Sequence, residues 1–373
     1  RARICARLHM SLDGFHADTN NPLTSSLITH DNDTREYVLD PRYKLLEEAS
    51  IANGAVLENV TVGQGQYGMT VLAIDPSKAI KIHLPESLLL PSEAVDFSTN
   101  TVKADVEVTD AIREYWNLYL DTVFGPEALA NRRAVEQAIS KENLHEWQEE
   151  EQIAILQRFL EVSENDSVLR QKLSSARVLS RQGNHFHMPY LDWVNHRHPS
   201  LGFATSKNGV KIEGEAFDGE VFVSYGMHDA MKLLNTYGFF NETSFAYAIP
   251  TSFKLSEELT LAVSNNNLDP LSFKNHILVP KIVRKDNVIL ADFCLLGNKG
   301  RPRAPRMSWG TGVNESVGLD SKTKQQMMAL YTGIQRRTWQ SLWKIYRRGE
   351  QVENEALRNL MMSAARDTFR NSL

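Results

Sequence analysis

The chain has 373 residues, of which 42% are hydrophobic and 23% are charged, and its formal net charge is −5. This length can bury the cores of two domains, and the slight acidity gives no global attraction to nucleic acid or to an anionic membrane. Its two cysteines, Cys5 and Cys294, exclude a disulfide framework and a cysteine-rich zinc site. Because no hydrophobic run approaches the roughly 18 residues of a membrane-spanning helix, we expect a soluble intracellular protein. The cytoplasm is the default location, with an organelle or the nucleus left open.

Residues 1–40 are polar, rich in Asn, Asp, Ser and Thr, and without a hydrophobic period, which predicts a flexible arm. Residues 1–9 are rich in arginine and free of acid, so a targeting segment, a native end and an appended segment all fit them. A short helix is predicted over residues 43–53. Strand-like runs follow at residues 56–62, 69–74 and 79–84.

The turn Gly63-Gln-Gly-Gln-Tyr-Gly68 matches the G-x-G-x-x-G pattern of nucleotide-binding loops. A dinucleotide-binding fold needs a helix directly after these glycines, whereas a strand-like run follows here. A protein kinase does place its glycine loop between strands, with a lysine such as Lys81 after it. A kinase also needs His-Arg-Asp and Asp-Phe-Gly segments, and the sequence has neither, because Cys294 follows Asp292-Phe293. The simplest interpretation is a glycine-rich β-turn.

Helical spacing dominates from about residue 105 to residue 176. Hydrophobic residues from Ile112 to Val123 recur at intervals of three and four and stop at Gly125-Pro126, which predicts one helix. Further helices are predicted over residues 126–139, 142–162 and 168–179. Because strand-like segments come before and after this region, we interpret it as a helical insertion in a β-rich domain.

The central segment combines strand-like runs with polar and aromatic residues. The run from His185 to Asp192 predicts a strand that turns at residues 193–196, and residues 219–226 predict a second strand that contains Tyr225. A Tyr-x-Phe segment, Tyr237 to Phe239, follows soon after. Such a set of side chains could line a narrow pocket.

The C-terminal region contains strand-like pieces such as 245–249 and 281–283, and then a basic, proline-rich loop over residues 299–306. The loop is expected to be exposed, where it could contact an acidic partner. Helices are predicted from Ser321 to the end, with an interruption at Gly349. A hydrophobic stripe at helical spacing predicts their buried face: Met327, Leu330, Tyr331, Ile334, Leu342, Ile345 and Tyr346.

Several of these segments, taken in order, resemble the SET-domain protein methyltransferases, and in particular the Rubisco large-subunit methyltransferase class. The resemblance covers about residues 41–245. Its motifs are the Asp192-x-x-Asn195-His196 turn, the Gly219-Glu220 pair followed by Tyr225, the Tyr237-Gly-Phe239 segment, the Gly68-Met69 turn and Arg177 ahead of the Asn-His pair.

The resemblance implies methyl transfer from S-adenosylmethionine to a lysine side chain of a protein substrate, with Tyr225 as the catalytic residue and no metal. Such a transfer is an in-line displacement that needs a neutral amine, which an aromatic channel favours by penalising the ammonium form. The implied cofactor-binding residues are Gly68, Met69, Arg177, Asp192, Asn195, His196, Tyr237 and Phe239. The implied substrate channel consists of Tyr190, Ser224, Tyr237 and Phe239.

The resemblance also implies an α+β architecture. A β-rich SET fold, residues 41–245, would carry an inserted helical subdomain at about residues 105–176, and a mostly helical C-terminal domain, residues 246–373, would help to bind the substrate. This class lacks the cysteine-rich zinc clusters of other SET enzymes, in agreement with the cysteine count. We expect a monomer whose partner is a protein substrate, with neither a membrane nor nucleic acid as a partner.

Four alternatives stay open on the sequence. The acceptor could be a histidine, because channel walls decide between lysine and histidine and the spacing does not reveal them. The chain could be a histidine-metal enzyme, since the pairs His185/His187 and His196/His198 place two imidazoles on one face of a strand. The other two are a kinase and a SET-like binding module that has lost catalysis.

Overall fold

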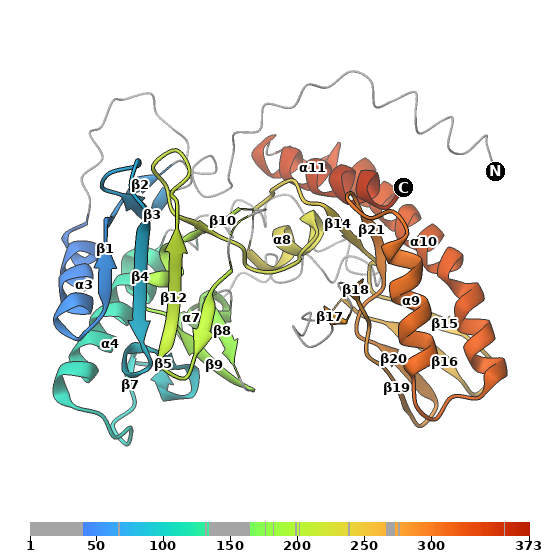
Figure 1. Cartoon of the computed structure of the whole chain (residues 1–373), viewed down its shortest axis with the longest axis horizontal. Helices are drawn as coiled ribbons and strands as arrows, with labels where there is room; N and C mark the ends of the chain where they lie inside the picture. The colour runs from blue at the N-terminus through green and yellow to red at the C-terminus, as the bar shows by residue number, and fades with distance from the viewer. Residues whose placement is uncertain are drawn as a thin grey trace.

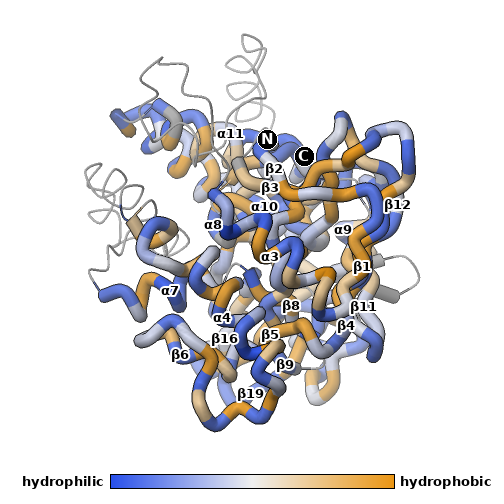
Figure 2. The backbone as a smooth tube through the Cα atoms, turned by 90° about the vertical axis from the view of Figure 1, so that its left-hand side faces the viewer, coloured by the Kyte–Doolittle hydropathy of each residue, from blue (hydrophilic) through white to orange (hydrophobic). Residues whose placement is uncertain are grey.

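The computed structural model describes residues 40–65, 68–130, 133, 165–175, 177–181, 183–197, 200, 202–237, 239–265, 273–274, 277–353 and 355–373. The predicted arm up to residue 39 and the predicted helix over residues 142–162 lie outside this set. The described residues form two lobes, with α8 (Ala230–Tyr237) between them (Figure 1). Hydrophobic and hydrophilic residues alternate over short distances along the chain (Figure 2), and none of the described helices is long and apolar enough to cross a membrane.

The N-terminal lobe is built from short strands around one hydrophobic core. Its strands are β1 (Val56–Glu58), β2 (Val60–Gly65), β3 (Gly68–Ala73), β4 (Ile80–Pro85), β5 (Leu90–Pro91), β6 (Val95–Asp96), β7 (Thr101–Val102), β8 (Val178–Arg181), β9 (Asn184–His187), β10 (Asn195–His196), β11 (Ala204–Ser206), β12 (Gly209–Gly214) and β13 (Phe222–Val223). The largest sheet has the order β1-β4-β12-β11 with antiparallel pairs. Strands from before and after the predicted insertion therefore meet in one sheet.

The helices of this lobe cover the sheets. They are α3 (Pro41–Ala52), α4 (Asp110–Phe124), α7 (Asp166–Ser175) and the short 3-10 helices η1 (Glu86–Leu88), η2 (Ser92–Ala94) and η4 (Leu191–Trp193). Helix α4 begins where the Thr109 hydroxyl accepts a hydrogen bond from the Ile112 N–H at 3.4 Å, and it ends before Gly125, as predicted. Its buried face includes Tyr115 and Tyr119.

Local structure differs from the sequence prediction at four places in this lobe. The strand predicted over residues 185–192 ends at His187 in β9, and η4 forms its last part. The strand predicted over residues 219–226 is limited to Phe222–Val223 in β13. Helix α7 ends at Ser175, and residues 178–181 form β8, which pairs with β9. Asn195 and His196 were predicted in a turn but form β10, which pairs in parallel with β13. For β8 and β10, pairing with a neighbouring strand decides the conformation, which a local sequence pattern does not reveal.

The C-terminal lobe begins with strands and ends with three long helices. Its elements are β14 (Phe245–Tyr247), β15 (Thr251–Lys254), β16 (Thr260–Val263), β17 (Phe273–Lys274), β18 (Ile277–Leu278), β19 (Ile282–Lys285), β20 (Val288–Ala291), β21 (Leu295–Asn298), α9 (Ala304–Glu315), α10 (Ser321–Gly349) and α11 (Glu355–Asn371). The sheet β15-β16-β20-β19 packs with α9 and α10 around one core. Together the two lobes confirm the predicted α+β class.

The C-terminal helices confirm the predicted stripe and correct the predicted loop. Met327, Tyr331, Ile334, Leu342 and Ile345 are buried on α10, which ends at Gly349. The predicted basic loop is shorter than expected, because α9 already begins at residue 304. A proline in the first turn of a helix, as here at residue 305, costs no intrahelical hydrogen bond, so it did not mark a loop.

Helix α8 is fixed to the C-terminal lobe by buried hydrogen bonds. One carboxylate oxygen of Asp229 accepts from the Lys232 N–H at 2.7 Å at the start of the helix, and the other accepts from the Tyr247 N–H of β14 at 2.8 Å. The Thr368 hydroxyl of α11 accepts from the Met231 N–H at 3.3 Å. The C-terminal lobe thus determines where α8 places Tyr237, its last residue.

The burial of two carboxyl groups near α8 predicts that the stability of the protein depends on pH. Burial raises the pKa of Asp229 to about 6 and the pKa of Asp367, which accepts from the Thr243 N–H at 3.2 Å, to about 7. The unfolded chain loses these protons near pH 4. The folded chain therefore binds more protons between pH 4 and pH 7, so the stabilisation is complete below pH 4 and is lost as the pH rises through 6 and 7.

We expect the free energy of unfolding, measured by urea denaturation, to fall by about 4 kcal/mol between pH 5 and pH 8. The fall is about 1.4 kcal/mol per pH unit for each group, over one unit for Asp229 and over two units for Asp367. The Asp367→Asn variant should show a smaller fall, and the exposed control Asp105→Asn should keep the wild-type slope. An unchanged slope in Asp367→Asn would contradict the assignment.

Candidate active site

Three segments that the sequence linked to one site lie side by side in the N-terminal lobe. Gly68 and Met69 begin β3, and the main chain of β3 bonds to residues 219–221 through Ala73 N–H to Gly219 O at 2.8 Å and Val221 N–H to Val71 O at 2.9 Å. Strand β13 follows directly and pairs with β10, which carries Asn195 and His196. The glycine turn, the segment before Tyr225 and the Asn-His pair are therefore neighbours. Because a strand follows Gly68, the dinucleotide-binding fold is excluded.

Tyr225 is held at both ends by the Asn-His segment. It lies two residues after β13, and its hydroxyl donates a hydrogen bond to the Val194 carbonyl oxygen at 2.7 Å. Its backbone N–H donates to Nδ1 of His196 at 2.9 Å, and the two rings lie 5.1 Å apart between centroids. Because Nδ1 accepts here, the neutral His196 ring carries its proton on Nε2. The Tyr225 side chain cannot move to another χ1 rotamer without breaking its hydroxyl contact.

Aromatic rings surround Tyr225. Its ring centroid lies 5.0 Å from that of Tyr237 and 6.5 Å from that of Phe239, and Phe239 lies 5.9 Å from His196. Phe203 stacks on Tyr225 at 6.4 Å with an interplanar angle of 14°. The structure thus brings four of the predicted residues into one cluster, which consists of His196, Tyr225, Tyr237 and Phe239, with Phe203 in addition.

The two tyrosines of this cluster and the neighbouring His228 are uncharged near neutral pH. Burial raises the pKa of the Tyr225 hydroxyl well above its ordinary value and raises the pKa of Tyr237 to about 12. Burial also lowers the pKa of His228, whose ring lies 5.9 Å from that of Tyr237, to about 4. The desolvation that keeps these groups neutral also penalises a cation brought beside them.

Arg177 stands beside the cluster on a buried support. Its guanidinium lies 3.2 Å from Oδ2 of Asp192, which also accepts from the Tyr119 hydroxyl of α4 at 2.7 Å. The Asp192 side chain is 2% exposed and the Arg177 side chain 35% exposed. Burial raises the pKa of the Asp192 carboxyl. Of the two predicted cofactor contacts, Arg177 therefore stays partly exposed, whereas the Asp192 carboxylate is buried against Arg177.

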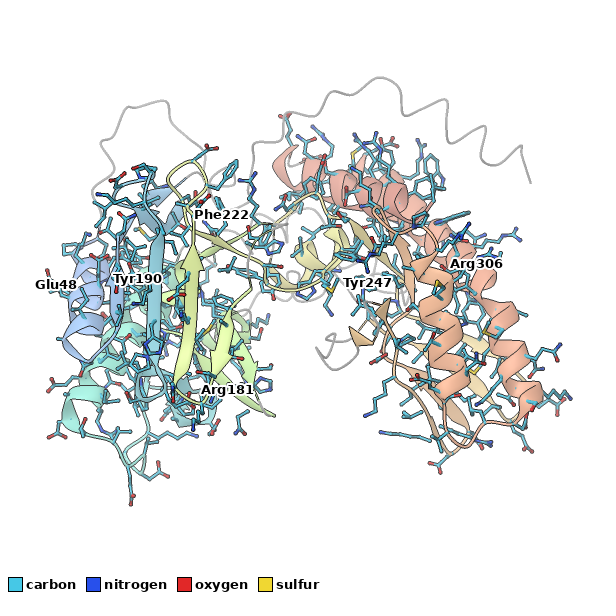
Figure 3. The ribbon with its side chains drawn as sticks, in the orientation of Figure 1. Glu48, Arg181, Tyr190, Phe222, Tyr247 and Arg306 are labelled. Carbon is cyan, nitrogen blue, oxygen red and sulfur yellow. The ribbon has the colours of Figure 1, made fainter. Side chains whose placement is uncertain are left out.

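Two predicted channel residues differ in their distance from Tyr225. Ser224 is its chain neighbour, with a hydroxyl that bonds to the Gly226 carbonyl oxygen at 3.3 Å. Tyr190 lies inside the N-terminal lobe (Figure 3), fully buried, with its ring 5.9 Å from that of Trp193 and its hydroxyl 3.4 Å from the Glu47 carboxylate. Tyr190 thus packs against residues other than those of the aromatic cluster.

Sequence reasoning missed four residues of this region, and their signals were weak. Phe203 lies just before β11, in a loop without a motif, and Tyr119 belongs to the hydrophobic stripe of α4 and was interpreted as core. His228 follows Tyr225 by three residues, and its Nε2 lies 3.2 Å from the Tyr225 carbonyl oxygen. Glu220 was noted as part of a motif but given no role, although it accepts a hydrogen bond from Nδ2 of Asn195 at 2.7 Å.

The histidine pairs do not form a metal site within the part of the chain that the structure describes, where no group of three His, Cys, Asp or Glu side chains could hold an ion. His187 is fully buried, and its Nε2 lies 3.2 Å from the Ser174 hydroxyl. Nδ1 of His185 lies 2.9 Å from the Ser180 hydroxyl. His198 lies outside the described residues.

No protein-family model and no curated protein sequence matches this chain. Among solved structures, it is similar to the SET domain of LSMT bound to lysine and AdoHcy, with 13% identity, 90% of each chain covered and a TM-score of 0.43. It is also similar to Rubisco LSMT bound to AdoMet, with 13% identity, 89% of this chain and 90% of that chain covered and a TM-score of 0.44. A third is Rubisco LSMT bound to sinefungin and monomethyllysine, with 14% identity, 89% and 90% coverage and a TM-score of 0.41. These structures belong to the class that the sequence motifs resemble.

Proposed function

We propose that this protein is an S-adenosylmethionine-dependent protein methyltransferase that acts on a lysine side chain. The placement of Tyr225 carries the proposal: its hydroxyl is fixed on the Val194 carbonyl oxygen, and its ring is enclosed by His196, Tyr237 and Phe239. The arrangement is a neutral, aromatic site beside the Asn-His pair, with an arginine at its edge. The residues of this site belong to the sequence motifs that resemble those of the SET-domain methyltransferases.

The proposed chemistry needs little acid-base assistance from the protein. S-adenosylmethionine supplies a sulfonium-bound methyl group, which passes to the amine nitrogen as the carbon–sulfur bond breaks, leaving S-adenosylhomocysteine. The protein must deliver the amine without its proton and in line with that bond. Tyr225, Tyr237 and Phe239 favour the neutral amine, because the ammonium form of lysine loses its hydration among them.

The residues beside the cluster suit the charged end of the cofactor. Arg177 retains 35% exposure while it is paired with Asp192, so its guanidinium can also bind a carboxylate. Asn195 presents an amide, and His196 presents main-chain groups in β10, for the amino-acid and adenine ends. Gly68 and Met69 offer backbone at the start of β3. These residues would hold the cofactor.

Incubation of the purified protein with methyl-labelled S-adenosylmethionine and a cell lysate tests the proposal. We expect label on one or a few proteins and, by mass spectrometry, on lysine. Label on histidine would overturn the acceptor and keep the class of enzyme. Failure to transfer label and failure to bind S-adenosylhomocysteine would together overturn the function.

A further inference from the structure

Glu220 is a buried acidic residue to which the proposed chemistry assigns no role. Glu220 as a whole is only 5% exposed to solvent. Its main chain forms an isolated antiparallel β-bridge with Leu72 of β3. On its other side, Glu220 and Phe217 each donate a backbone hydrogen bond to the other, at 2.9 and 2.8 Å. A buried carboxylate requires compensating partners, so its surroundings should explain its presence.

The Glu220 carboxylate connects two segments of the candidate active site. Oε1 accepts from Nδ2 of Asn195 in β10 at 2.7 Å. Oε2 lies against Gly65 of the glycine turn, where a Cβ atom added to Gly65 would lie 2.8 Å from it. The carboxylate therefore occupies the space between the glycine hairpin and the Asn-His pair.

This contact determines which way the Asn195 amide points. An ionised carboxylate has only acceptors, so the amide must turn its NH2 group toward Glu220 and its oxygen away. Within the described part of the chain, Oδ1 of Asn195 accepts no hydrogen bond, and this oxygen is not buried. An accessible carbonyl oxygen in this position is an acceptor for a positively charged N–H donor.

We infer that Glu220 is a positioning residue that sets the Asn195 amide so that Oδ1 accepts a hydrogen bond from the α-ammonium group of the cofactor. The inference rests on the proposed function. It assigns the ammonium to Asn195 and the carboxylate to Arg177, so that the two charges of the amino-acid end are recognised by separate groups. Glu220 itself does not touch the cofactor.

Glutamine at position 220 provides a sharp test because it preserves shape while supplying both a donor and an acceptor. In Glu220→Gln the Asn195 amide can turn over and direct its NH2 group at the ammonium. Two ligands are titrated calorimetrically: S-adenosylhomocysteine and its analogue in which hydrogen replaces the α-amino group. We expect Glu220→Gln to weaken S-adenosylhomocysteine about tenfold or more and the deaminated analogue less than about twofold.

Two further variants keep the test decisive. Asn195→Ala removes the accepting oxygen without altering Glu220 and should show the same selective loss. Glu213→Gln, on an exposed residue of β12, should bind both ligands as the wild type does. If Asn195→Ala or a folded Glu220→Gln weakens both ligands by the same factor, the inference is overturned. A wild-type protein that binds neither ligand would instead overturn the proposed function.

Discussion

The Tyr225→Phe variant should transfer methyl groups at least about a hundredfold more slowly than the wild type, the usual effect of removing one preorganised polar group from a reacting centre. The substitution deletes one oxygen, which donates to the Val194 carbonyl oxygen at 2.7 Å, and leaves the ring among its aromatic neighbours. Affinity for S-adenosylhomocysteine should stay within about threefold, since a hydrogen bond that does not reach the ligand contributes little to its binding. The rate is measured with labelled S-adenosylmethionine, and the affinity by calorimetry.

Tyr115→Phe makes the same chemical change away from the site and serves as the control. The Tyr115 hydroxyl lies 3.0 Å from the Ser50 hydroxyl, between α4 and α3, so its loss should affect stability and not the rate of transfer. Full activity in Tyr225→Phe would refute the role of that hydroxyl. A wild-type protein that binds S-adenosylhomocysteine but transfers no methyl group to any lysate protein would favour the binding-module alternative.

The fold could be predicted from the sequence where one element decides its own conformation. Helices α4 and α10 have a hydrophobic stripe and clear ends, so their limits follow from local rules. Strand β10 has only two residues, and it is a strand because it pairs with β13, across 25 intervening positions that include other strands. The start of α9 was missed for a different reason, because Pro305 fits the first turn of a helix as well as a loop.

The sequence motifs predicted the aromatic residues of the candidate site, but they did not predict the residues that support them. Tyr225, Tyr237 and Phe239 follow each other within a short stretch, and the structure places their rings together. Phe203 and Tyr119 reach the region from separate segments, and no sequence spacing encodes that approach. The resemblance implied a cofactor contact for Asp192, and only the fold shows that its carboxylate is paired with Arg177.

The pair of Asp192 and Arg177 leads to the substitution with the largest expected effect on stability. Asp192 is 2% exposed and compensates Arg177, and the Tyr119 hydroxyl donates to the same carboxylate at 2.7 Å. Removing one partner of a fully buried ion pair costs about 3–5 kcal/mol, and the 35% exposure of the Arg177 side chain places the cost here at the lower end, about 3 kcal/mol. We therefore expect Asp192→Ala to lower the free energy of unfolding by about that amount, measured by urea denaturation.

The matched control for Asp192→Ala is Glu350→Ala, which breaks the exposed ion pair with Arg347 at 2.8 Å and should cost no more than about 1 kcal/mol. In the folded fraction of Asp192→Ala, binding of S-adenosylhomocysteine should weaken as well, because Arg177 loses the carboxylate that orients its guanidinium. Asp192→Asn should fall between the alanine variant and the wild type, since an amide oxygen can still accept from Arg177 and Tyr119 but carries no charge. Equal costs for Asp192→Ala and Glu350→Ala would show that Arg177 is stabilised by solvent, and Asp192 would then have no part in holding it at the site.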